Sequence, residues 1–358
     1  MTSSKERIQL LSQVCSLDEV SQWLGKVSSE DLSAWLTSEL GSDVILDDFQ
    51  PHGPLLSKAI APQNILHIVS GNTPHAAFQS LIRGLLIGSH NVIKTPSSGL
   101  PELTDTIPLF PEALRNMIEV HTSLADEHWT NANAIIAIGS DASIEAIQAR
   151  VQPHQTFIAH SHKISIGVVY DQLENAAPLA ARDVSLYNQR GCLSLHAIYV
   201  SGDSEVFAHS LAREMAAFVH DFPPEELTKQ EAGAIRNLRE TIRFQAANDS
   251  AVQLWESTDS LDWTVIHDPS PTLKLSCLNR CVYVKPLPAA LNTETLGAES
   301  RHLSTVALHP FNTSHALMLE HLPATRICPM GTSQEPSIFW HHDGYAPLAS
   351  LVKWQDIG

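Results

Sequence analysis

The chain has 358 residues, 43% hydrophobic and 17% charged, which is the composition of a soluble globular protein long enough for two domains. Its formal net charge of −17 argues against nucleic acid or an anionic membrane as a partner. No apolar run has the length of a membrane span, and the N-terminal residues show no signal-peptide pattern. The five cysteines are scattered and odd in number, so we expect no disulfide framework and a cytoplasmic location.

Residues 1–60 are expected to form two or three short amphipathic helices. Ser16–Glu19 (SLDE) matches a capping box and precedes apolar residues at helical spacing. A second helix carries Trp35 and Leu36 on its apolar face, and Gly41 suits its C-terminal cap. The simplest interpretation of this segment is a packing or dimer-forming cap.

Residues 61–163 read as an open, doubly wound α/β domain. The apolar run Ile65–Val69 predicts a buried strand, and the next segment predicts a helix with Thr73 as N-cap and Pro74 at the first helical position. Asn91–Thr95 is the next strand, which completes a β-α-β unit. The strand-to-helix step recurs at Ala134–Ile147, and further strands are expected at 156–160 and 165–170.

Residues 164–345 are expected to form a second α/β domain, followed by a tail at 346–358. The second half opens with a turn and a buried strand at Tyr187–Val200 and continues with a long helical stretch from Ser204 to about Ala247. Later strands are expected at 262–267, 281–285 and 304–309. The predicted fold is therefore two open doubly wound domains with a cleft between them.

Several polar residues follow the strands of the first domain. The chain has no G-x-G-x-x-G fingerprint. Gly139–Ser143 (GSDAS) begins a helix whose N-terminus either binds a phosphate, which Asp141 would repel, or is an ordinary helix start with Asp141 as its cap. Asn72 lies between strand and helix, where it either donates into a ligand site or forms a simple turn. Lys94 ends a strand and is either solvated or placed to reach a ribose or phosphate.

Cys192 stands out among the cysteines because of the residues before it. A lone cysteine before a strand is usually a core residue. Here it follows Asn188–Gly191 (NQRG), which we expect to form a polar, flexible turn. We also expect Arg190 and a helix N-terminus to make its thiol easier to ionise. With Asn72 as an oxyanion donor, Cys192 would act as a nucleophile.

The order of these motifs resembles the aldehyde dehydrogenase superfamily. The segments beginning ILHIVSGNTP, AIGSDAS and HKIS, followed by NQRGC and the tail RICPMGTSQEPSIFW, look like its acyl-CoA reductase branch, the LuxC-like fatty acyl-CoA reductases of bacterial luminescence. The resemblance extends from about Ile65 to Trp354. It implies reduction of an acyl thioester to an aldehyde through a cysteine thioester.

The resemblance assigns roles to individual positions. Cys192 matches the family's nucleophile and Asn72 the asparagine that helps to bind the oxyanion. Lys94 matches the lysine that holds the adenosine ribose, and Gly139 and Ser140 match the turn beside the cofactor phosphates. These matches make residues 61–163 the nicotinamide-dinucleotide domain and residues 164–345 the catalytic domain.

One segment departs from the pattern of the oxidising members. Lys163 matches the lysine after their E-L-G-G segment, but Ala159 stands where their water-activating glutamate would be. We therefore expect a thiol acceptor, such as coenzyme A, rather than water. Ser97 occupies the position where NAD-preferring relatives carry an acidic residue, so NADP(H) is expected, with NAD(H) as the alternative.

The remaining expectations concern metals, proton transfer and partners. His160 and His162 are candidates for the proton donor to the thiohemiacetal, and no metal is expected because Cys328 and the histidines at 341–342 lack a zinc spacing. The acyl donor would be acyl-CoA or a carrier-bound acyl group, with an acyl-donating synthetase as a possible partner and a homo-oligomer as the expected assembly. The alternatives are an acylating short-chain aldehyde dehydrogenase and a non-catalytic or acyl-transfer subunit of a multi-enzyme complex.

Overall fold

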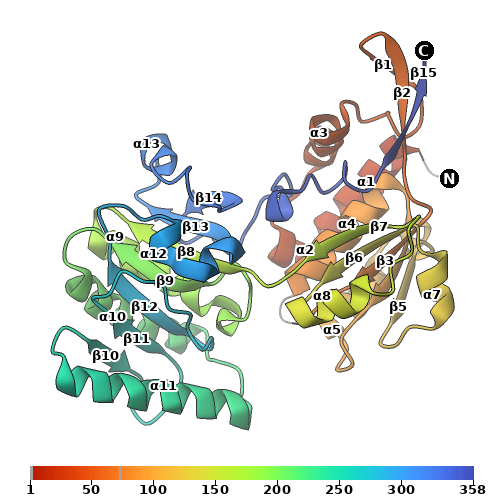
Figure 1. The fold of residues 1–358 in the computed structure, drawn as a ribbon. Coiled ribbons are helices and arrows are strands. Elements are labelled where there is room, and N and C mark those ends of the chain that lie inside the picture. The colour runs from red at the N-terminus through yellow and green to blue at the C-terminus, as the bar shows by residue number, and fades with distance from the viewer. Residues whose placement is uncertain (1–2, 72–73) are drawn as a thin grey trace. The chain divides into compact units, whose positions relative to one another are not determined.

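The computed structural model describes residues 3–71 and 74–358, which divide into two compact units (Figure 1). The first unit contains the chain up to His162 together with Glu335–Gly358, and the second contains Lys163–Gln334. Residues 3–60 therefore pack within the first unit, and residues 335–345, expected in the catalytic domain, belong to the first unit as well. The chain passes between the units twice, at 162–163 and at 334–335.

Three helices open the first unit: α1 (Ser4–Cys15), α2 (Asp18–Leu24) and α3 (Ser29–Leu40). The predicted capping box at Ser16–Glu19 is wrong, because the Ser16 hydroxyl donates to the Ser12 carbonyl at the end of α1 and Leu17 precedes α2 without a side-chain cap. The capping box lies instead at Ser28 and Asp31, at the start of α3. Gly41 ends α3 at φ 87°, as predicted, since this left-handed conformation favours glycine.

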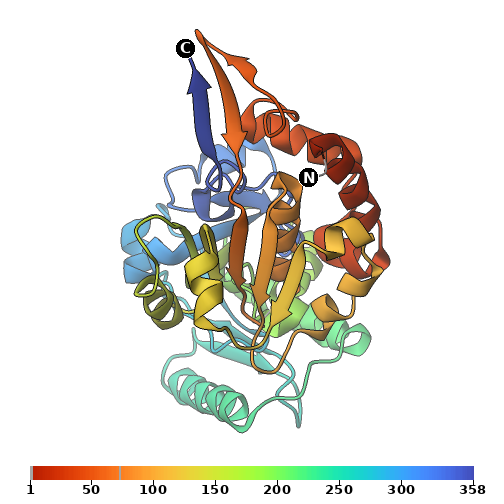
Figure 2. The same ribbon diagram turned by 90° about the vertical axis from the view of Figure 1, so that its right-hand side faces the viewer.

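A five-stranded parallel sheet forms the centre of the first unit, in the order β5-β4-β3-β6-β7. Its strands are β3 (Asn64–Ile68), β4 (His90–Lys94), β5 (Ile118–His121), β6 (Ala134–Ile138) and β7 (Thr156–His160). Helix α4 (Pro74–Ile87) connects β3 to β4 and packs with α1 to α3 over one face, whereas α7 (Asp126–Asn131) and residues near α8 (Asp141–Gln148) cover the other. Figure 2 looks toward this unit. The chain leaves β3 toward β4 and later returns to place β6 on its other side, so the sheet is doubly wound with a switch point between β3 and β6.

A small antiparallel sheet in the first unit was not predicted. It has the order β1-β2-β15 and joins the C-terminal strand to residues 50–60. The strands are β1 (Gln50–His52), β2 (Leu55–Ile60) and β15 (Lys353–Ile357). Short, largely exposed strands give a weak pattern in the sequence, and β15 pairs with a strand that lies far from it along the chain. The other short helices are α5 (Pro101–Thr104), η1 (Ile107–Leu109), α6 (Glu112–Arg115) and η4 (His342–Gly344).

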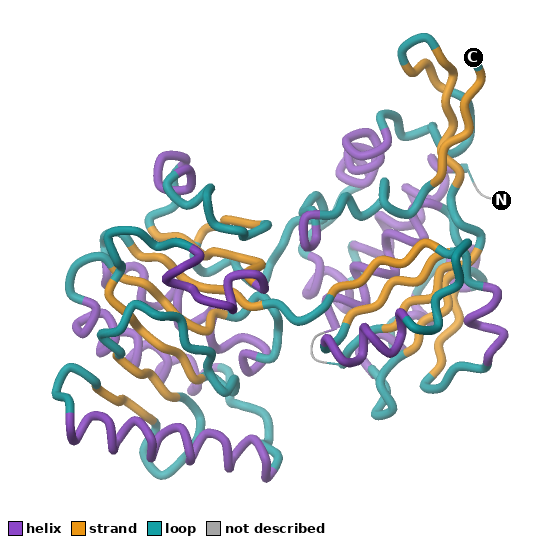
Figure 3. Tube along the Cα trace, in the orientation of Figure 1, coloured by secondary structure: helices purple, strands orange, loops and turns teal. Residues whose placement is uncertain are grey.

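A seven-stranded sheet forms the second unit, in the order β10-β11-β12-β9-β8-β13-β14, parallel except for β10 (Figure 3). Its strands are β8 (Ile164–Val169), β9 (Leu195–Val200), β10 (Gln253–Glu256), β11 (Thr264–His267), β12 (Cys281–Pro286), β13 (Leu303–His309) and β14 (Arg326–Pro329). Apolar clusters cover both faces of the sheet. The second unit is therefore also an open sheet with helices on both sides.

The predicted long helix after Ser204 is two helices, because Pro223 and Pro224 interrupt it. They are α10 (Ser204–Asp221) and α11 (Lys229–Asn248). The remaining helices of the second unit are α9 (Leu173–Ser185), η2 (Leu186–Gln189), α12 (Thr293–Leu296), η3 (Gly297–His302) and α13 (Thr313–Leu317). Within the described part of the chain, no helix is long and apolar enough to cross a membrane.

Candidate active site

Cys192 lies in a turn at the N-terminal end of β9 and is exposed. The Ser194 N–H donates to the Gly191 carbonyl at 3.0 Å, which closes the turn around Cys192. The Ser165 hydroxyl, from neighbouring strand β8, donates to the Cys192 carbonyl at 2.9 Å. An exposed thiol on a backbone that is fixed from a neighbouring strand is suited to a nucleophile rather than to core packing.

The residues before Cys192 form a strained and well-held turn rather than a flexible one. Tyr187, Asn188 and Gln189 have φ values of 51°, 50° and 61°, in the left-handed region that non-glycine residues avoid. Each such residue costs on the order of 1–3 kcal/mol, so this conformation persists only where surrounding contacts impose it. Clusters of this kind gather at functional sites.

Arg190 forms ion pairs with two glutamates. Its guanidinium lies 2.7 Å from Glu225 and 3.0 Å from Glu231, so two carboxylates already balance its charge. No helix begins at Cys192, because the chain enters β9 at Leu195. The easier ionisation of the Cys192 thiol stays a prediction. What the structure supplies at this position is a fixed backbone.

The other four cysteines differ from Cys192 in burial. Burial raises the pKa of Cys15 to about 12 and that of Cys328 to about 11, so both thiols stay protonated. Cys277 and Cys281 are hydrogen-bonded to each other, which lowers the pKa of the half-buried Cys277 and raises that of the buried Cys281. Cys277 is therefore the second thiol to be considered as a nucleophile.

The predicted cofactor residues of the first unit gather at one edge of its sheet. Lys94 is the last residue of β4, and Gly139 and Ser140 follow β6. Ser97 is exposed in a turn closed by the Gly99 N–H and the Pro96 carbonyl, 2.9 Å apart. These are the carboxyl ends of strands beside the switch point, where open α/β sheets bind ligands. Asn72 comes after β3 in the sequence but lies outside the described residues.

The N-terminus of α8 is a less suitable site for a phosphate than the residues after β4, because it carries Asp141. Ser140 caps the helix, since its Oγ accepts from the Ser143 N–H at 3.3 Å. The Asp141 carboxylate accepts the His162 N–H at 3.0 Å, so this carboxylate fastens the end of the β7 connection. Asp141 is therefore not the helix cap. Because the Asp141 carboxylate would repel a phosphate, the groups here that suit one are Lys94 and the hydroxyls of Ser97 and Ser140.

Lys163 and Ala159 lie on opposite sides of the first crossing between the units. Ala159 is half-buried in β7, pairs with Ala137 of β6, and offers no base. Lys163 is the first residue of the second unit and directly precedes β8. Because Ser165 pairs with Leu195 in the sheet, Lys163 and Cys192 lie at the same, N-terminal edge of the second unit.

His160 belongs to a buried cluster with His342 and Asp343. Its Nδ1 lies 2.7 Å from Asp343 Oδ2, and its ring stacks on His342 at 3.7 Å with an interplanar angle of 10°. The three side chains are close enough to share a metal, but the nitrogen lone pairs of stacked rings lie in separate parallel planes, which does not suit a shared ion. Buried Arg83, whose pKa burial lowers to about 10, lies near enough to interact with the Asp343 charge. The cluster reads as a buried charge network, and Cys328 has no part in it.

A second group that could hold a metal lies on the surface. Glu119 and His121 of β5 are 3.4 Å apart, and His128 of α7 lies beside them. Glu119 also approaches His90 at 3.4 Å, so its carboxylate is shared by ordinary exposed pairs.

Of the two candidate proton donors, His162 is exposed and His160 is buried.

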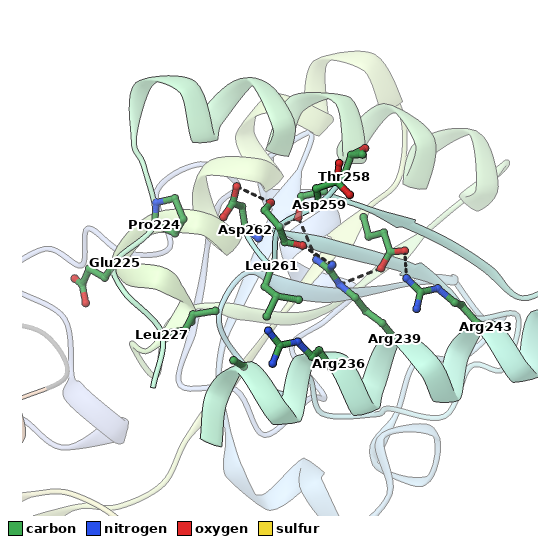
Figure 4. Close-up of a pocket in the computed structure, with 14 residues that line it drawn as sticks. Pro224, Glu225, Leu227, Arg236, Arg239, Arg243, Thr258, Asp259, Leu261 and Asp262 are labelled. Carbon is green, nitrogen blue, oxygen red and sulfur yellow. Dashed lines mark hydrogen bonds and ion pairs between the residues drawn. The ribbon is translucent and has the colours of Figure 1, made fainter. Parts of the chain in front are cut away.

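A cavity of about 870 Å³ in the second unit lies between α11 and the loop from β10 to β11 (Figure 4). Its arginines are largely committed to the protein: Arg239 lies 3.1 Å from Glu256, and Arg243 also pairs with Glu256. Neither Cys192 nor a predicted cofactor residue lines it. The cavity is polar and lies over these ion pairs. Glu225, in its lining, connects it to the Cys192 turn through Arg190.

A model of the acyl-CoA reductase (LuxC) family matches residues 4–354. The chain belongs to this family. The long-chain acyl-protein thioester reductase 2 of Photobacterium leiognathi is 24% identical over 354 residues, which cover 93% of this chain and 72% of the relative. The long-chain acyl-protein thioester reductase of Photorhabdus laumondii is 26% identical over 341 residues, covering 88% of this chain and 68% of that protein.

Solved structures similar to this LuxC-family chain are aldehyde dehydrogenases. The methylmalonate-semialdehyde dehydrogenase of Oceanimonas doudoroffii matches with a TM-score of 0.71 and 10% identity, over 99% of this chain and 86% of that one. The gamma-glutamyl-gamma-aminobutyraldehyde dehydrogenase of Burkholderia cenocepacia matches with a TM-score of 0.70 and 13% identity, over 99% and 84% of the two chains. The LuxC-family chain therefore has the predicted aldehyde dehydrogenase-like α/β fold.

Asp183 and Gln334 connect the segment before residue 335, where the chain passes back to the first unit, with the residues around Cys192. Its fully buried carboxylate, in α9, accepts the N–H groups of Gly331 at 2.7 Å and Ser333 at 3.0 Å. Gln334 in turn donates to the Ser194 hydroxyl at 2.8 Å. Residues near 183 and 334 carry no sequence signal that links them to Cys192, because these contacts join segments about 140 residues apart. Burial raises the pKa of Asp183 to about 6.

This raised pKa predicts a pH dependence of stability in the LuxC-family chain. A carboxyl whose pKa is raised on folding does not lower the stability of the folded state below about pH 4, where it is protonated in both states. It lowers that stability most above about pH 6, where it is ionised in the folded state as well. The free energy of unfolding should therefore fall across this range, and Asp183→Asn should lack that part of the fall. Urea unfolding of parent and variant at several pH values measures it.

The control for this measurement is Asp221→Asn, since Asp221 is exposed at the end of α10. The difference in unfolding free energy between Asp183→Asn and the parent should rise in favour of the variant between pH 4 and 6, while the control should show no such trend. A difference that stays constant with pH would contradict the role assigned to burial of Asp183.

Proposed function

We propose that this chain reduces an acyl thioester to an aldehyde with NADPH, through a thioester on Cys192. The observation that carries the proposal is an exposed cysteine on a fixed, strained turn, in a member of the acyl-CoA reductase family. The names of its relatives, long-chain acyl-protein thioester reductases, favour a long acyl chain. We infer that the second unit performs the covalent chemistry and the first binds the nucleotide.

The covalent steps follow from the chemistry of a thiolate. Cys192 Sγ attacks the thioester carbonyl, and the tetrahedral intermediate expels the donor thiolate, which takes up a proton and leaves as a thiol. A hydride added to the resulting acyl-enzyme gives a thiohemiacetal on Cys192. This intermediate is protonated at its oxygen. When its C–S bond breaks, the hydroxyl releases that proton, which yields the aldehyde and restores the Cys192 thiolate. We assign oxyanion stabilisation to Asn72 with a backbone N–H, on the strength of the resemblance alone.

The residues of the first unit suit a nicotinamide dinucleotide phosphate. When bound, this cofactor would supply the hydride. Lys94 would hold the adenosine ribose, with Gly139 and Ser140 beside the diphosphate, at the carboxyl ends of β4 and β6. Exposed Ser97 offers a hydroxyl and no negative charge, which favours a 2′-phosphate. We also assign Lys163 to the cofactor, because of its match to the family segment.

Water is a poor acceptor in this proposal. Ala159 offers no base, and general-base assistance is typically worth about a hundredfold or more. We favour His162 over His160 as the proton donor to the thiohemiacetal, because His160 is buried and held by Asp343 while His162 is exposed. An acyl-enzyme that water hydrolyses slowly persists long enough to be reduced.

The donor, the partners and the location are inferred at a coarser level. The donor is an acyl group on coenzyme A or on a protein, the latter suggested by the names of the relatives, with a synthetase as the partner that would supply it. A short-chain acylating aldehyde dehydrogenase and an acyl-transfer subunit are the competing functions, separated by activity against a series of chain lengths. We infer a cytoplasmic protein because its cysteines form no disulfide, and a homo-oligomer from the exposed edge strand β15.

The first prediction from this function concerns the acyl-enzyme. Labelled acyl-CoA without nicotinamide should transfer about one acyl group per chain, in a linkage that hydroxylamine cleaves. Cys192→Ala should abolish the label, and Cys277→Ala, which removes the other thiol that could ionise, should leave it intact. Labelling of Cys192→Ala to the extent of the parent would show that the nucleophile lies elsewhere.

The second prediction concerns the choice of nicotinamide. The parent should have the higher kcat/KM with NADPH, and Ser97→Glu should lower that value by roughly ten- to a hundredfold, because a carboxylate repels the 2′-phosphate. Neighbouring Ser98 is also exposed, so Ser98→Glu is the matched control and should have a smaller effect. A parent that works equally well with NADH, and is unchanged by Ser97→Glu, would refute the assignment.

A further inference from the structure

Gln189 is a fully buried polar residue three positions before Cys192. It is the last of the three left-handed residues, so the backbone leaves the strained segment there and enters the turn that carries the thiol. Its side chain points into the protein at the N-terminal ends of two strands. A buried amide in such a place must be fully hydrogen-bonded, and this one is.

The side chain of Gln189 joins the turn to both neighbouring strands. Its Nε2 donates to the Leu195 carbonyl at 2.7 Å and to the Cys281 carbonyl at 2.7 Å, and its Oε1 accepts the Cys281 N–H at 2.9 Å. Leu195 begins β9 and Cys281 begins β12, which are paired strands of the sheet. One side chain therefore sets the position of the turn relative to two strand ends.

A backbone contact supports the same junction. The Asn279 N–H donates to the Asn188 carbonyl at 3.1 Å. Asn279 lies in a second left-handed run, Leu278–Arg280, with φ values from 53° to 64°, directly before β12. Two strained segments are thus docked against each other, and Gln189 supplies the side-chain bonds that hold them together.

We propose that Gln189 is a positioning residue for acyl transfer to Cys192, which rests on the proposed function. It acts through the backbone: it fixes the turn so that the Cys192 thiolate is oriented for attack on the thioester carbonyl. Displacement of a reacting atom by about 1 Å costs on the order of a hundredfold in rate. Loss of the three hydrogen bonds should therefore slow acylation far more than it weakens substrate binding.

The competing explanation is that Gln189 only stabilises the fold, and the chain offers a matched control for it. Gln155, at the start of β7, is also buried and makes the same kinds of bond. Its Nε2 donates to the carbonyls of Trp129 at 2.6 Å and Ala132 at 2.8 Å, and its Oε1 accepts the Gln152 N–H at 2.8 Å. It lies in the first unit, at the opposite edge of the sheet from the predicted cofactor residues.

The test compares Gln189→Met with Gln155→Met, each of which removes three hydrogen bonds at similar side-chain length. At saturating acyl-CoA, Gln189→Met should acylate Cys192 about ten- to a hundredfold more slowly than the parent, with an unchanged half-saturating concentration. Gln155→Met should acylate within twofold of the parent. Hydrogen exchange of the amides at 190–195 should be at least tenfold faster in Gln189→Met and unchanged in Gln155→Met.

A second variant covers the case in which Gln189→Met does not fold. In Gln189→Glu the new carboxyl can donate to a carbonyl only when protonated, so its acylation rate relative to the parent should recover as the pH is lowered. Circular dichroism at each pH checks that the variant is folded. Recovery of the rate in a variant that stays folded throughout supports the positioning role, whereas recovery that only follows refolding contradicts it.

The outcomes separate this inference from the proposed function. If the parent is acylated at Cys192 and Gln189→Met keeps pace with Gln155→Met, the positioning role is wrong and the function stands. If the parent is not acylated, the function fails, and unchanged exchange at 190–195 in Gln189→Met would overturn the inference as well. Faster exchange would show that Gln189 still fixes the turn.

Discussion

The turn that carries Cys192 depends on the hydrogen bonds between one buried amide and two strand ends. Gln189 bridges β9 and β12, and the left-handed residues 187–189 keep their conformation because those bonds oppose its cost. Ser165 and Gln334 hold the other side of the same turn, through the Cys192 carbonyl and the Ser194 hydroxyl. Cys192 is thus an exposed group on one of the most constrained segments of the described chain.

Charge is distributed to suit this arrangement. The net charge is −17, yet buried cations are balanced locally: Arg83 interacts with Asp343, and Lys285 pairs with Asp268 at 2.7 Å. Arg190 is likewise neutralised by two glutamates. The cations left for an anionic ligand in the predicted sites are therefore few. The proposed function uses two of them, Lys94 at the end of β4 and Lys163 directly before β8.

The sequence predicts the repeating units of the fold well, because continuous apolar runs and capped helices are local signals. The β-α-β unit around Pro74 and the strand after Cys192 are confirmed. The small sheet β1-β2-β15 and the assignment of residues 335–345 to the first unit depend on pairing between distant segments, so no local pattern reveals them. The capping box at Ser16 was wrong since a neighbouring helix end uses that hydroxyl.

The site was predictable to a similar extent. The motif containing Cys192 identifies a candidate nucleophile, but its sequence suggested a flexible turn activated by Arg190. The structure instead shows a strained turn, with Arg190 paired to glutamates 35 and 41 residues away. Ser165, Asp183 and Gln334 support the turn from other elements, and single-sequence patterns carry no sign of such contacts.

The central claim is that a Cys192 thioester forms before any hydride is transferred. Rapid-quench measurement of coenzyme A released from acyl-CoA, with and without NADPH, tests this order directly. The account predicts a burst of about one coenzyme A per chain without NADPH, followed by a slow phase as water removes the acyl group. Release of coenzyme A only in step with NADPH oxidation, with no burst in its absence, would contradict it.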